Sequence, residues 1–339
     1  MLVSIRCEAD MILLFPPSSF TILNNINIRL AYGELGTLNF KFPPKLLNSV
    51  KMSKESIAFI GTGVMGRSMA GHLLSSGYLV NVYNRTQSKA DELVAAGASW
   101  CDSPAIAASG ADIVITIVGF PKDVEEVYLG DDGILANAKS GSLIIDMTTS
   151  SPMLAKKIAA AAAEKGIGAL DAPVSGGDLG AKEARLSIMV GGSQTDFDRA
   201  QPVFEVMGKN IQLQGEAGSG QYTKMVNQIA IASGMMGICE AMAYARKSGL
   251  DPFTVLKSIE TGAAGSWSLS NLAPRALKGD FAPGFYVKHF IKDMRIAIES
   301  ADEMGLELPG LKLAKSLYDK LAAQGGEDNG TQALLKLYQ

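Results

Sequence analysis

Gly61, Gly63 and Gly66 form a glycine-rich turn with the spacing GxGxxG. An apolar run at residues 56–60 precedes the turn, and a helical pattern of apolar residues follows it. In this context the first glycine permits a tight bend, the second lets the backbone approach a pyrophosphate, and the third lets helix and strand pack closely. The helix N-terminus adds amides that bind phosphate oxygens. The turn therefore predicts a dinucleotide site, whose expected cofactor contacts are Gly61, Gly63, Val64, Met65 and Gly66.

The next apolar run ends in the sequence Asn84-Arg85-Thr86. Sites that prefer NAD place an acidic residue here, which binds the ribose 2′-hydroxyl and repels a 2′-phosphate. In this chain Arg85 can instead pair with the phosphate and stack on adenine, and its two neighbours can donate hydrogen bonds to the phosphate. The pattern favours NADP(H) over NAD(H), with an exposed turn arginine as the alternative interpretation.

Two later stretches place polar groups in apolar surroundings. Residues 175–177, Ser-Gly-Gly, follow an apolar run and present a hydroxyl and open amides, which suit a carboxylate; a plain loop explains them equally well. Lys224, Asn227 and Gln228 share one face of a long apolar helix. A lysine with two amides beside it is costly to bury without a function, unless its ammonium reaches solvent along its own stem.

The elements that position these groups follow from the hydrophobic pattern. Apolar runs alternate with helical patterns over roughly 160 residues, which predicts an α/β fold with a Rossmann-type, doubly wound parallel sheet. The rest of the chain lacks strand-like alternation, so an all-α second domain follows. Strands are expected at residues 56–60, 78–83, 111–118, 142–147, 169–174 and 186–191. Helices are expected after the turn and at residues 88–96, 152–165, 221–248, 254–260, 287–304, 311–323 and 331–337.

The predicted domains are an extension at residues 1–54, a dinucleotide-binding domain at 55–217 and a substrate and dimerisation domain at 218–339. The extension has six basic and three acidic residues without clear periodicity. A targeting or processing segment and an unstructured or artefactual extension explain it equally well, and Met52 could be the true start. A cytoplasmic location is expected, or a mitochondrial one if the extension acts as a transit segment.

Composition excludes several classes of protein. The chain has 339 residues with 31 basic and 34 acidic side chains, a net charge of −3, which argues against a nucleic-acid or membrane-surface partner. No apolar stretch reaches the length of a membrane span. Three distant cysteines indicate a reducing compartment and no disulfide framework. With two histidines in the chain, no metal site is expected.

The motifs together resemble the β-hydroxyacid dehydrogenase family, which includes 3-hydroxyisobutyrate dehydrogenases and the reductases of glyoxylate, succinic semialdehyde and tartronate semialdehyde. The likeness is strongest to the 3-hydroxyisobutyrate dehydrogenase-like proteins of plants. The matching stretches are IAFIGTGVMGRSMAGHLL, DAPVSGGDLGAK, GSGQYTKMVNQ and FYVKHFIKDMR. The resemblance implies an NAD(P)-dependent oxidoreductase acting on CH–OH groups, with a small carboxylate-bearing aldehyde or hydroxy acid as substrate.

The resemblance also assigns residues. It implies that Lys224 exchanges the proton with the substrate oxygen and that Asn227 holds the substrate near it. Ser175, Gly176 and Gly177 would bind the substrate carboxylate. Phe285 and Asp293 would line the site. Pro121, Thr149 and Lys292 would lie against the cofactor. A homodimer or homotetramer is expected, because helical domains of this kind complete their site against a second subunit.

Some features depart from relatives in the family. Many of them have asparagine where this chain has Gln228, and residues 262–268 differ from the glyoxylate reductases, which leaves the identity of the substrate open. The related 6-phosphogluconate dehydrogenases have histidine at the position of Asn227 and a longer second domain, which argues against sugar-phosphate decarboxylation. A non-catalytic dinucleotide-binding module is the remaining alternative, although such modules lose the lysine found here at position 224.

Overall fold

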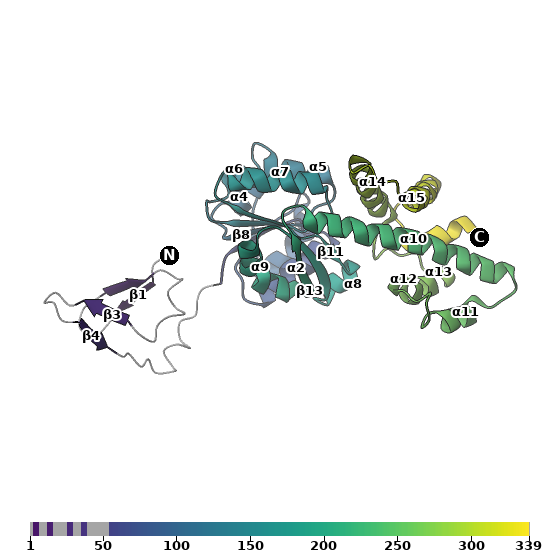
Figure 1. Cartoon of the computed structure of the whole chain (residues 1–339), viewed down its shortest axis with the longest axis horizontal. Helices are drawn as coiled ribbons and strands as arrows, with labels where there is room; N and C mark the ends of the chain where they lie inside the picture. The colour runs from purple at the N-terminus through teal and green to yellow at the C-terminus, as the bar shows by residue number, and fades with distance from the viewer. Residues whose placement is uncertain (1–2, 7–11, 16–25, 30–34, 39–53, 339) are drawn as a thin grey trace. The chain divides into compact units, whose positions relative to one another are not determined.

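The computed structural model describes residues 3–6, 12–15, 26–29, 35–38 and 54–338 (Figure 1). The chain divides into two units, Met1–Ser53 and Lys54–Gln339, and each is described by itself. The rest of the first unit, where the sequence left a targeting or an unstructured segment open, lies outside the described residues. The first unit contains two antiparallel strand pairs, β1 (Val3–Arg6) with β2 (Ile12–Phe15) and β3 (Ile26–Arg29) with β4 (Leu35–Leu38).

The second unit contains a nine-stranded sheet in the order β11-β12-β10-β9-β8-β5-β6-β7, with β13 beside β12. The strands from β7 to β10 in this order pair in parallel, which confirms the Rossmann-type sheet predicted from the sequence. The bounds are β5 (Ile57–Ile60), β6 (Val80–Tyr83), β7 (Ser99–Trp100), β8 (Ile113–Thr116), β9 (Leu143–Asp146), β10 (Gly168–Asp171), β11 (Val174–Ser175), β12 (Leu186–Gly191) and β13 (Gly208–Gly215).

The sheet is not parallel throughout, whereas the sequence predicts a parallel sheet. Strand β12 runs antiparallel to β10 and β11, and β13 runs parallel to β12. The connection from β11 to β12 covers residues 176–185, which is shorter than the dozen or so residues that a parallel crossover requires. Strand β13 was not predicted, because its residues are mostly exposed and polar.

Helices cover both faces of this sheet (Figure 1). On β5, Ile57 and Phe59 belong to the apolar core beneath α2 and α9, whereas Ala58 and Ile60 belong to the core beneath α4 to α7. Because these strands are buried on both faces, their sequences are nearly continuous runs of apolar residues. The helices are α2 (Val64–Ser75), η2 (Gln87–Ala90), α3 (Asp91–Ala95), α4 (Pro104–Ala108), α5 (Pro121–Leu129), α6 (Ile134–Asn137), α7 (Pro152–Ala163), α8 (Gly177–Lys182) and α9 (Gln194–Met207).

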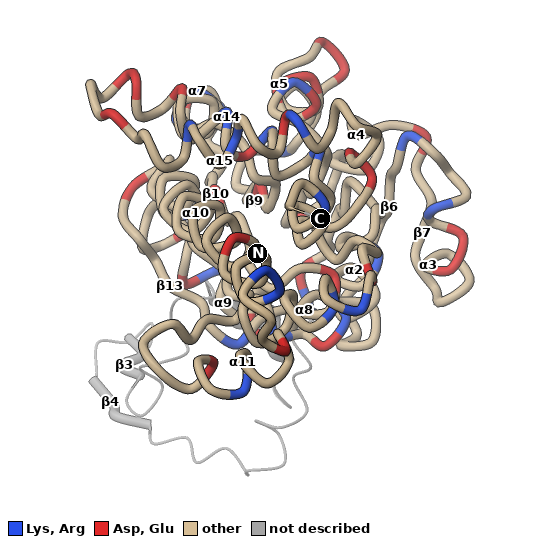
Figure 2. Tube along the Cα trace, turned by 90° about the vertical axis from the view of Figure 1, so that its right-hand side faces the viewer, with Lys and Arg blue, Asp and Glu red and all other residues tan. Residues whose placement is uncertain are grey.

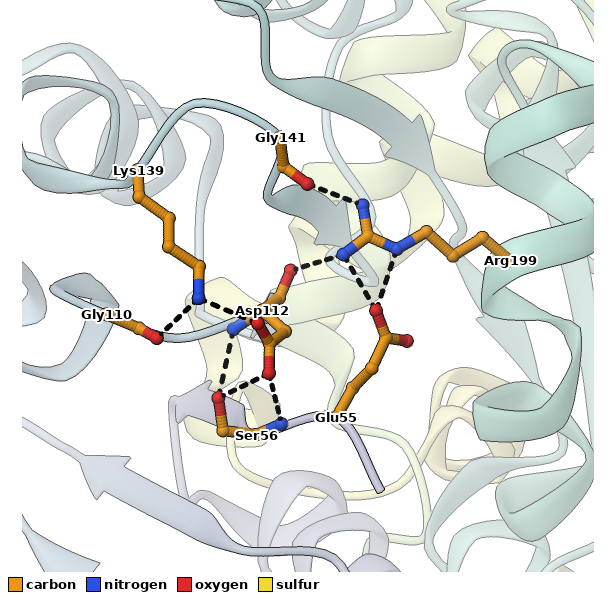
Figure 3. Close-up of polar contacts among 7 residues, drawn as sticks. All are labelled: Glu55, Ser56, Gly110, Asp112, Lys139, Gly141 and Arg199. Atoms are coloured by element: carbon orange, nitrogen blue, oxygen red, sulfur yellow. Dashed lines mark hydrogen bonds and ion pairs between the residues drawn. The ribbon is translucent and has the colours of Figure 1, made fainter. Parts of the chain in front are cut away.

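A cluster of polar contacts joins residues at the N-terminal ends of β5 and β8 (Figure 3). The Asp112 carboxylate accepts hydrogen bonds from the amide and hydroxyl of Ser56 and from Lys139 Nζ, at 2.8, 2.9 and 2.7 Å. Partial burial alone would raise the pKa of Asp112, but these hydrogen bonds hold it at about 2. Arg199 Nη1 and Nη2 donate to the carbonyls of Gly141 and Asp112. The cluster lies at the N-terminal ends of β5 and β8, whereas the Gly-rich turn follows the C-terminal end of β5.

The remainder of the second unit is helical, as the sequence predicts. Between residues 218 and 338 the structure contains no strand apart from a single bridge between Tyr286 and Gly330. Residues 331–338 form a 3₁₀-helix rather than the expected α-helix. The helices are α10 (Ser219–Lys247), α11 (Pro252–Ile259), α12 (Trp267–Asn271), α13 (Ala273–Leu277), α14 (Val287–Glu303), α15 (Pro309–Leu321), η3 (Ala322–Gly326) and η4 (Thr331–Tyr338).

Helix α10 links the two parts of the second unit. Its first turns pack against β10, β12 and β13, and its later turns pack against α14, α15 and η4 (Figure 1). Among the described residues, no helix is long and apolar enough to cross a membrane. Basic and acidic residues are interspersed along the described trace (Figure 2).

Candidate active site

The glycine-rich turn between β5 and α2 is closed on one side and open on the other. Gly61 has φ of +102°, and a Cβ built there would lie 2.2 Å from the Ile117 carbonyl oxygen. A Cβ on Gly66 would lie 1.9 Å from the Gly61 carbonyl oxygen. No atom lies within 4 Å of a Cβ built on Gly63. The first and third glycines are therefore required by packing, whereas the second keeps space free.

This turn fits a dinucleotide. Gly63 is the N-terminal flanking residue of α2, so the free amides of Val64 and Met65 lie beside the open space. The buried Thr62 hydroxyl has no hydrogen-bond partner among the described residues, which leaves a polar atom for a ligand to satisfy. A bound pyrophosphate would lie against these amides.

Residues 84–86 follow β6 and contact the same turn. Asn84 Oδ1 accepts the Thr62 amide at 3.0 Å, and Asn84 Nδ2 donates to the Thr86 carbonyl at 2.9 Å. The Asn84 side chain therefore braces the turn rather than extending toward solvent. Arg85 extends outward with 74% of its side chain exposed, and its Nη1 lies 3.0 Å from Asp123 Oδ1.

Asp123 was not singled out from the sequence. It lies in the first turn of α5, where its Oδ2 also accepts the Phe120 amide at 3.0 Å. Pro121, expected near the cofactor, begins this helix. The Phe120 ring lies 5.5 Å from that of His289 on α14, so the loop contacts the helical part of the unit.

Lys224 is buried in the second turn of α10, with 7% of its surface exposed. Its Nζ donates to the Val174 carbonyl at 2.9 Å, which places it beside the loop that begins at Ser175. Burial lowers the pKa of Lys224 to about 8; the carboxylate of Asp293 opposes this shift and the ammonium of Lys292 adds to it. A lysine of this kind can exchange a proton near neutral pH.

The loop expected to bind a carboxylate lies against the same helix. Ser175 Oγ is 3.4 Å from Asn227 Oδ1 on α10. Gly176 and Gly177 have φ of +131° and +64°, a conformation that glycine adopts without strain. A Cβ on Gly177 would lie 3.6 Å from the Gly284 carbonyl oxygen. This contact places Phe285 near the loop, although its own ring packs on Phe290.

A buried network joins α10 to α14. Asn227 Nδ2 donates to Gln228 Oε1 at 2.7 Å, and Gln228 Nε2 donates to Asp293 Oδ2. Lys292 and Asp293 form an ion pair at 3.0 Å, with only 6% and 1% of the two residues exposed. Gln228 therefore links Asn227 on α10 to Asp293 on α14.

The same network reaches the sheet. Lys292 Nζ donates to the carbonyls of Thr149 and Gly119, at 2.8 and 3.4 Å. These carbonyls lie in the loops after β9 and β8. Of the residues expected in the site, the structure thus brings together Ser175, Lys224, Asn227, Asp293, Lys292 and Thr149.

Two family profiles match the chain. Residues 56–215 match the NAD binding domain of 6-phosphogluconate dehydrogenase, and residues 218–338 match the "NAD-binding of NADP-dependent 3-hydroxyisobutyrate dehydrogenase". Both matches fall on the second unit.

Curated relatives cover the same part of the chain. "Uncharacterized oxidoreductase YkwC" of Bacillus subtilis strain 168 is 64% identical over 285 residues, which are 84% of this chain and 99% of that protein. "Probable 3-hydroxyisobutyrate dehydrogenase-like 1, mitochondrial" of Arabidopsis thaliana is 52% identical over 284 residues, which are 84% of this chain and 85% of that protein. Among solved structures, 3-hydroxyisobutyrate dehydrogenase of Mycobacterium tuberculosis with L-serine is 32% identical and superimposes with a TM-score of 0.78, covering 84% of this chain and 99% of that one.

Proposed function

The chain belongs to the family of NAD(P)-dependent hydroxyacid dehydrogenases that includes the 3-hydroxyisobutyrate dehydrogenases, and from this premise we propose that it transfers hydride between NADP(H) and a small carboxylate-bearing aldehyde or the corresponding hydroxy acid. The observation that carries the proposal is the buried Lys224, which lies beside the Ser175 loop and near Asp293 and Lys292. The nicotinamide, when bound, supplies or accepts the hydride.

Lys224 is the proposed acid and base. In reduction its ammonium gives a proton to the carbonyl oxygen while hydride reaches the carbon. In oxidation its neutral amine removes the hydroxyl proton. The hydrogen bond to the Val174 carbonyl fixes one N–H of Lys224 and directs the others elsewhere.

The lowered pKa of Lys224 predicts opposite pH dependences for the two directions. Because burial holds the pKa at about 8, the neutral amine becomes the main form only above that pH. We therefore expect kcat/KM for oxidation to rise as pH increases through about 8, and kcat/KM for reduction to fall. Profiles of kcat/KM against pH, measured in both directions, test this. Profiles that run in the same direction would argue against Lys224 as the proton carrier.

The loop at residues 175–177 is the proposed carboxylate site. Ser175 offers a hydroxyl, and the two glycines leave their backbone amides without a side chain above them. Asn227 Oδ1 lies 3.4 Å from Ser175 Oγ, so the amide group of Asn227 can hold the same substrate next to Lys224. L-serine, named with the Mycobacterium tuberculosis structure, is a small 3-hydroxy carboxylate of the size we propose.

We propose that Arg85 gives the site its preference for NADP(H). No acidic residue occupies position 84, and Arg85 carries an exposed guanidinium beside the turn. Asp123 already pairs with one edge of Arg85, which leaves its remaining N–H groups for a 2′-phosphate.

Substitution of Arg85 tests this preference. In Arg85→Gln we expect the KM for NADPH to rise about 10- to 100-fold, the worth of a charge-assisted hydrogen bond, whereas the KM for NADH stays unchanged. Arg295→Gln removes an exposed arginine on α14 and is the matched control. Equal losses with both cofactors would show that Arg85 does not recognise the 2′-phosphate.

The proposed reaction is tested with a substrate panel. Glyoxylate, succinic semialdehyde, methylmalonate semialdehyde and tartronate semialdehyde are supplied with NADPH and, separately, with NADH. L-serine and 3-hydroxyisobutyrate are supplied with the oxidised cofactors. We expect rapid cofactor conversion with at least one of these compounds and faster reaction with NADPH than with NADH. Protein that binds NADPH but converts none of them would refute the proposed substrate class.

A further inference from the structure

Gln221 has a buried side-chain amide in the first turn of α10, one turn before Lys224. Its Oε1 accepts the Ser150 amide at 2.9 Å, and its Nε2 donates to the Thr148 carbonyl at 2.7 Å. Its own backbone amide donates to Asp171 Oδ2 at 2.8 Å. The side-chain amide of Gln221 therefore both accepts a hydrogen bond from and donates one to the same short segment of the loop after β9, residues 148–150.

The two peptide groups that Gln221 binds lie on either side of Thr149. A single side-chain amide therefore fixes the backbone of this residue from both neighbours. The Thr149 carbonyl accepts Lys292 Nζ at 2.8 Å, so the orientation of that carbonyl decides where Lys292 is anchored. Among the twenty side chains, only glutamine and asparagine present a neutral donor and acceptor side by side in this way, and asparagine is shorter.

The contacts of Gln221 complete a closed network of polar contacts that runs from α10 to α14 and back through the loop after β9. Gln221, Lys224 and Gln228 are spaced by three and four residues, so they share one face of α10. Gln228 donates to Asp293, which pairs with Lys292. Lys292 donates to the Thr149 carbonyl, and the peptide groups on both sides of Thr149 return to Gln221. The residues of this network are buried or nearly so, and their side chains therefore have little freedom to move if one contact is lost.

The first turn of α10 packs closely against strands β10 and β12. The Gly218 amide donates to Asp171 Oδ1 at 2.7 Å. A Cβ on Gly220 would lie 2.4 Å from the Met189 carbonyl oxygen and 2.5 Å from that of Asp171. The helix start therefore cannot shift to compensate for a change in Gln221, so the loss of its amide contacts would be taken up by the loop at Thr149.

We propose that Gln221 is a positioning residue for hydride transfer: it holds the Thr148–Ser150 segment, and with it the anchor of Lys292, at a fixed place relative to Lys224. This inference rests on the proposed function and adds a determinant of its geometry. Gln221 touches neither the reacting atoms nor the proton that Lys224 exchanges. Its effect is on the chemical step, where a displacement of about 1 Å can cost about 100-fold in rate.

Two substitutions and one control test the proposal. Gln221→Met keeps the length and volume of the side chain but removes the donor and the acceptor. Gln221→Glu keeps an acceptor and regains a donor only when it is protonated. Gln332→Met removes an equally buried amide, one that donates to the carbonyls of Asp280 and Ala282 in another part of the helical region. The control reports the cost of losing any buried amide.

We expect kcat of Gln221→Met to fall about 10- to 100-fold, while the KM values for cofactor and substrate change by less than about threefold. The deuterium isotope effect on kcat, measured with NADPH that carries deuterium at both C4 positions, should increase because hydride transfer becomes rate-limiting. Gln332→Met should keep the kcat of the wild-type protein even though it loses thermal stability. The kcat of Gln221→Glu, relative to wild type, should rise as pH falls and the carboxyl binds a proton.

Amide hydrogen exchange at Ser150 supplies a readout that needs no substrate. The Ser150 amide should exchange faster in Gln221→Met than in the wild-type or Gln332→Met proteins. Unchanged exchange, an unchanged kcat in Gln221→Met, or an equal loss of kcat in Gln332→Met would each overturn the role of Gln221. Absence of turnover in the wild-type protein would instead count against the proposed function, and the Ser150 exchange would still decide whether Gln221 holds the loop.

Discussion

Lys224→Met is expected to lower kcat by about 10²- to 10⁴-fold, the usual contribution of a positioned general acid or base. The substitution retains the apolar stem that packs in α10 and removes the ammonium that donates to the Val174 carbonyl. Because a buried ammonium costs free energy to desolvate, its removal should not unfold the protein. Affinity for NADPH should persist, since the Gly-rich turn is a separate part of the structure.

Steady-state kinetics and fluorescence titration with NADPH together measure this outcome. Lys320→Met, which replaces an exposed lysine near the end of α15, is the control and should behave as wild type. Retention of the wild-type kcat in Lys224→Met would remove the lysine from the mechanism. Loss of NADPH binding together with turnover would indicate a structural role for Lys224.

Gly63→Ala is expected to weaken NADP(H) binding by about 10- to 100-fold while leaving the melting temperature of the free protein unchanged. Gly63 has φ of −67°, which alanine adopts readily, and no atom lies within 4 Å of the added Cβ. The methyl group would instead fill the space that the turn leaves for a pyrophosphate. Dissociation constants from titration, together with thermal melts with and without NADPH, measure both effects.

Two further variants, Gly66→Ala and Gly237→Ala, distinguish a loss of space for the ligand from a loss of packing within the protein. In Gly66→Ala the Cβ would lie 1.9 Å from the Gly61 carbonyl oxygen, so the free protein should lose stability as well as affinity. Gly237→Ala adds a methyl group at an exposed position of α10 with no atom within 4 Å, and should leave NADPH affinity unchanged. Wild-type NADPH affinity in Gly63→Ala would place the dinucleotide somewhere other than this turn.

Much of the sheet can be predicted from the sequence, because strands buried on both faces read as apolar runs. Residues 113–116 and 143–146 lie fully inside the runs that predict them. Strand β13 escapes such prediction because it pairs only with β12 and exposes Gln212 and Gln214. The antiparallel direction of β12 depends on the length of its connection, which an apolar pattern does not encode.

The motif residues could be named from the sequence, but their partners could not. Spacing along α10 places Lys224, Asn227 and Gln228 on one face without revealing that Gln228 contacts Asp293, 65 residues later. The pairing of Arg85 with Asp123 likewise joins segments that are adjacent only in the fold. A polar residue at the start of an apolar helix was the available signal for Gln221, and its meaning depends on the loop after β9.

Transfer of deuterium to the product, from NADPH that carries deuterium at both C4 positions, would show hydride transfer directly. The wild-type protein is incubated with the labelled cofactor and the semialdehyde that it converts fastest, and the hydroxy acid formed is examined by NMR. We expect deuterium on the carbinol carbon of that product, formed at a rate that Lys224→Met lowers by about 10²- to 10⁴-fold. A product without deuterium, or labelled product formed equally fast by Lys224→Met, would contradict the proposed mechanism.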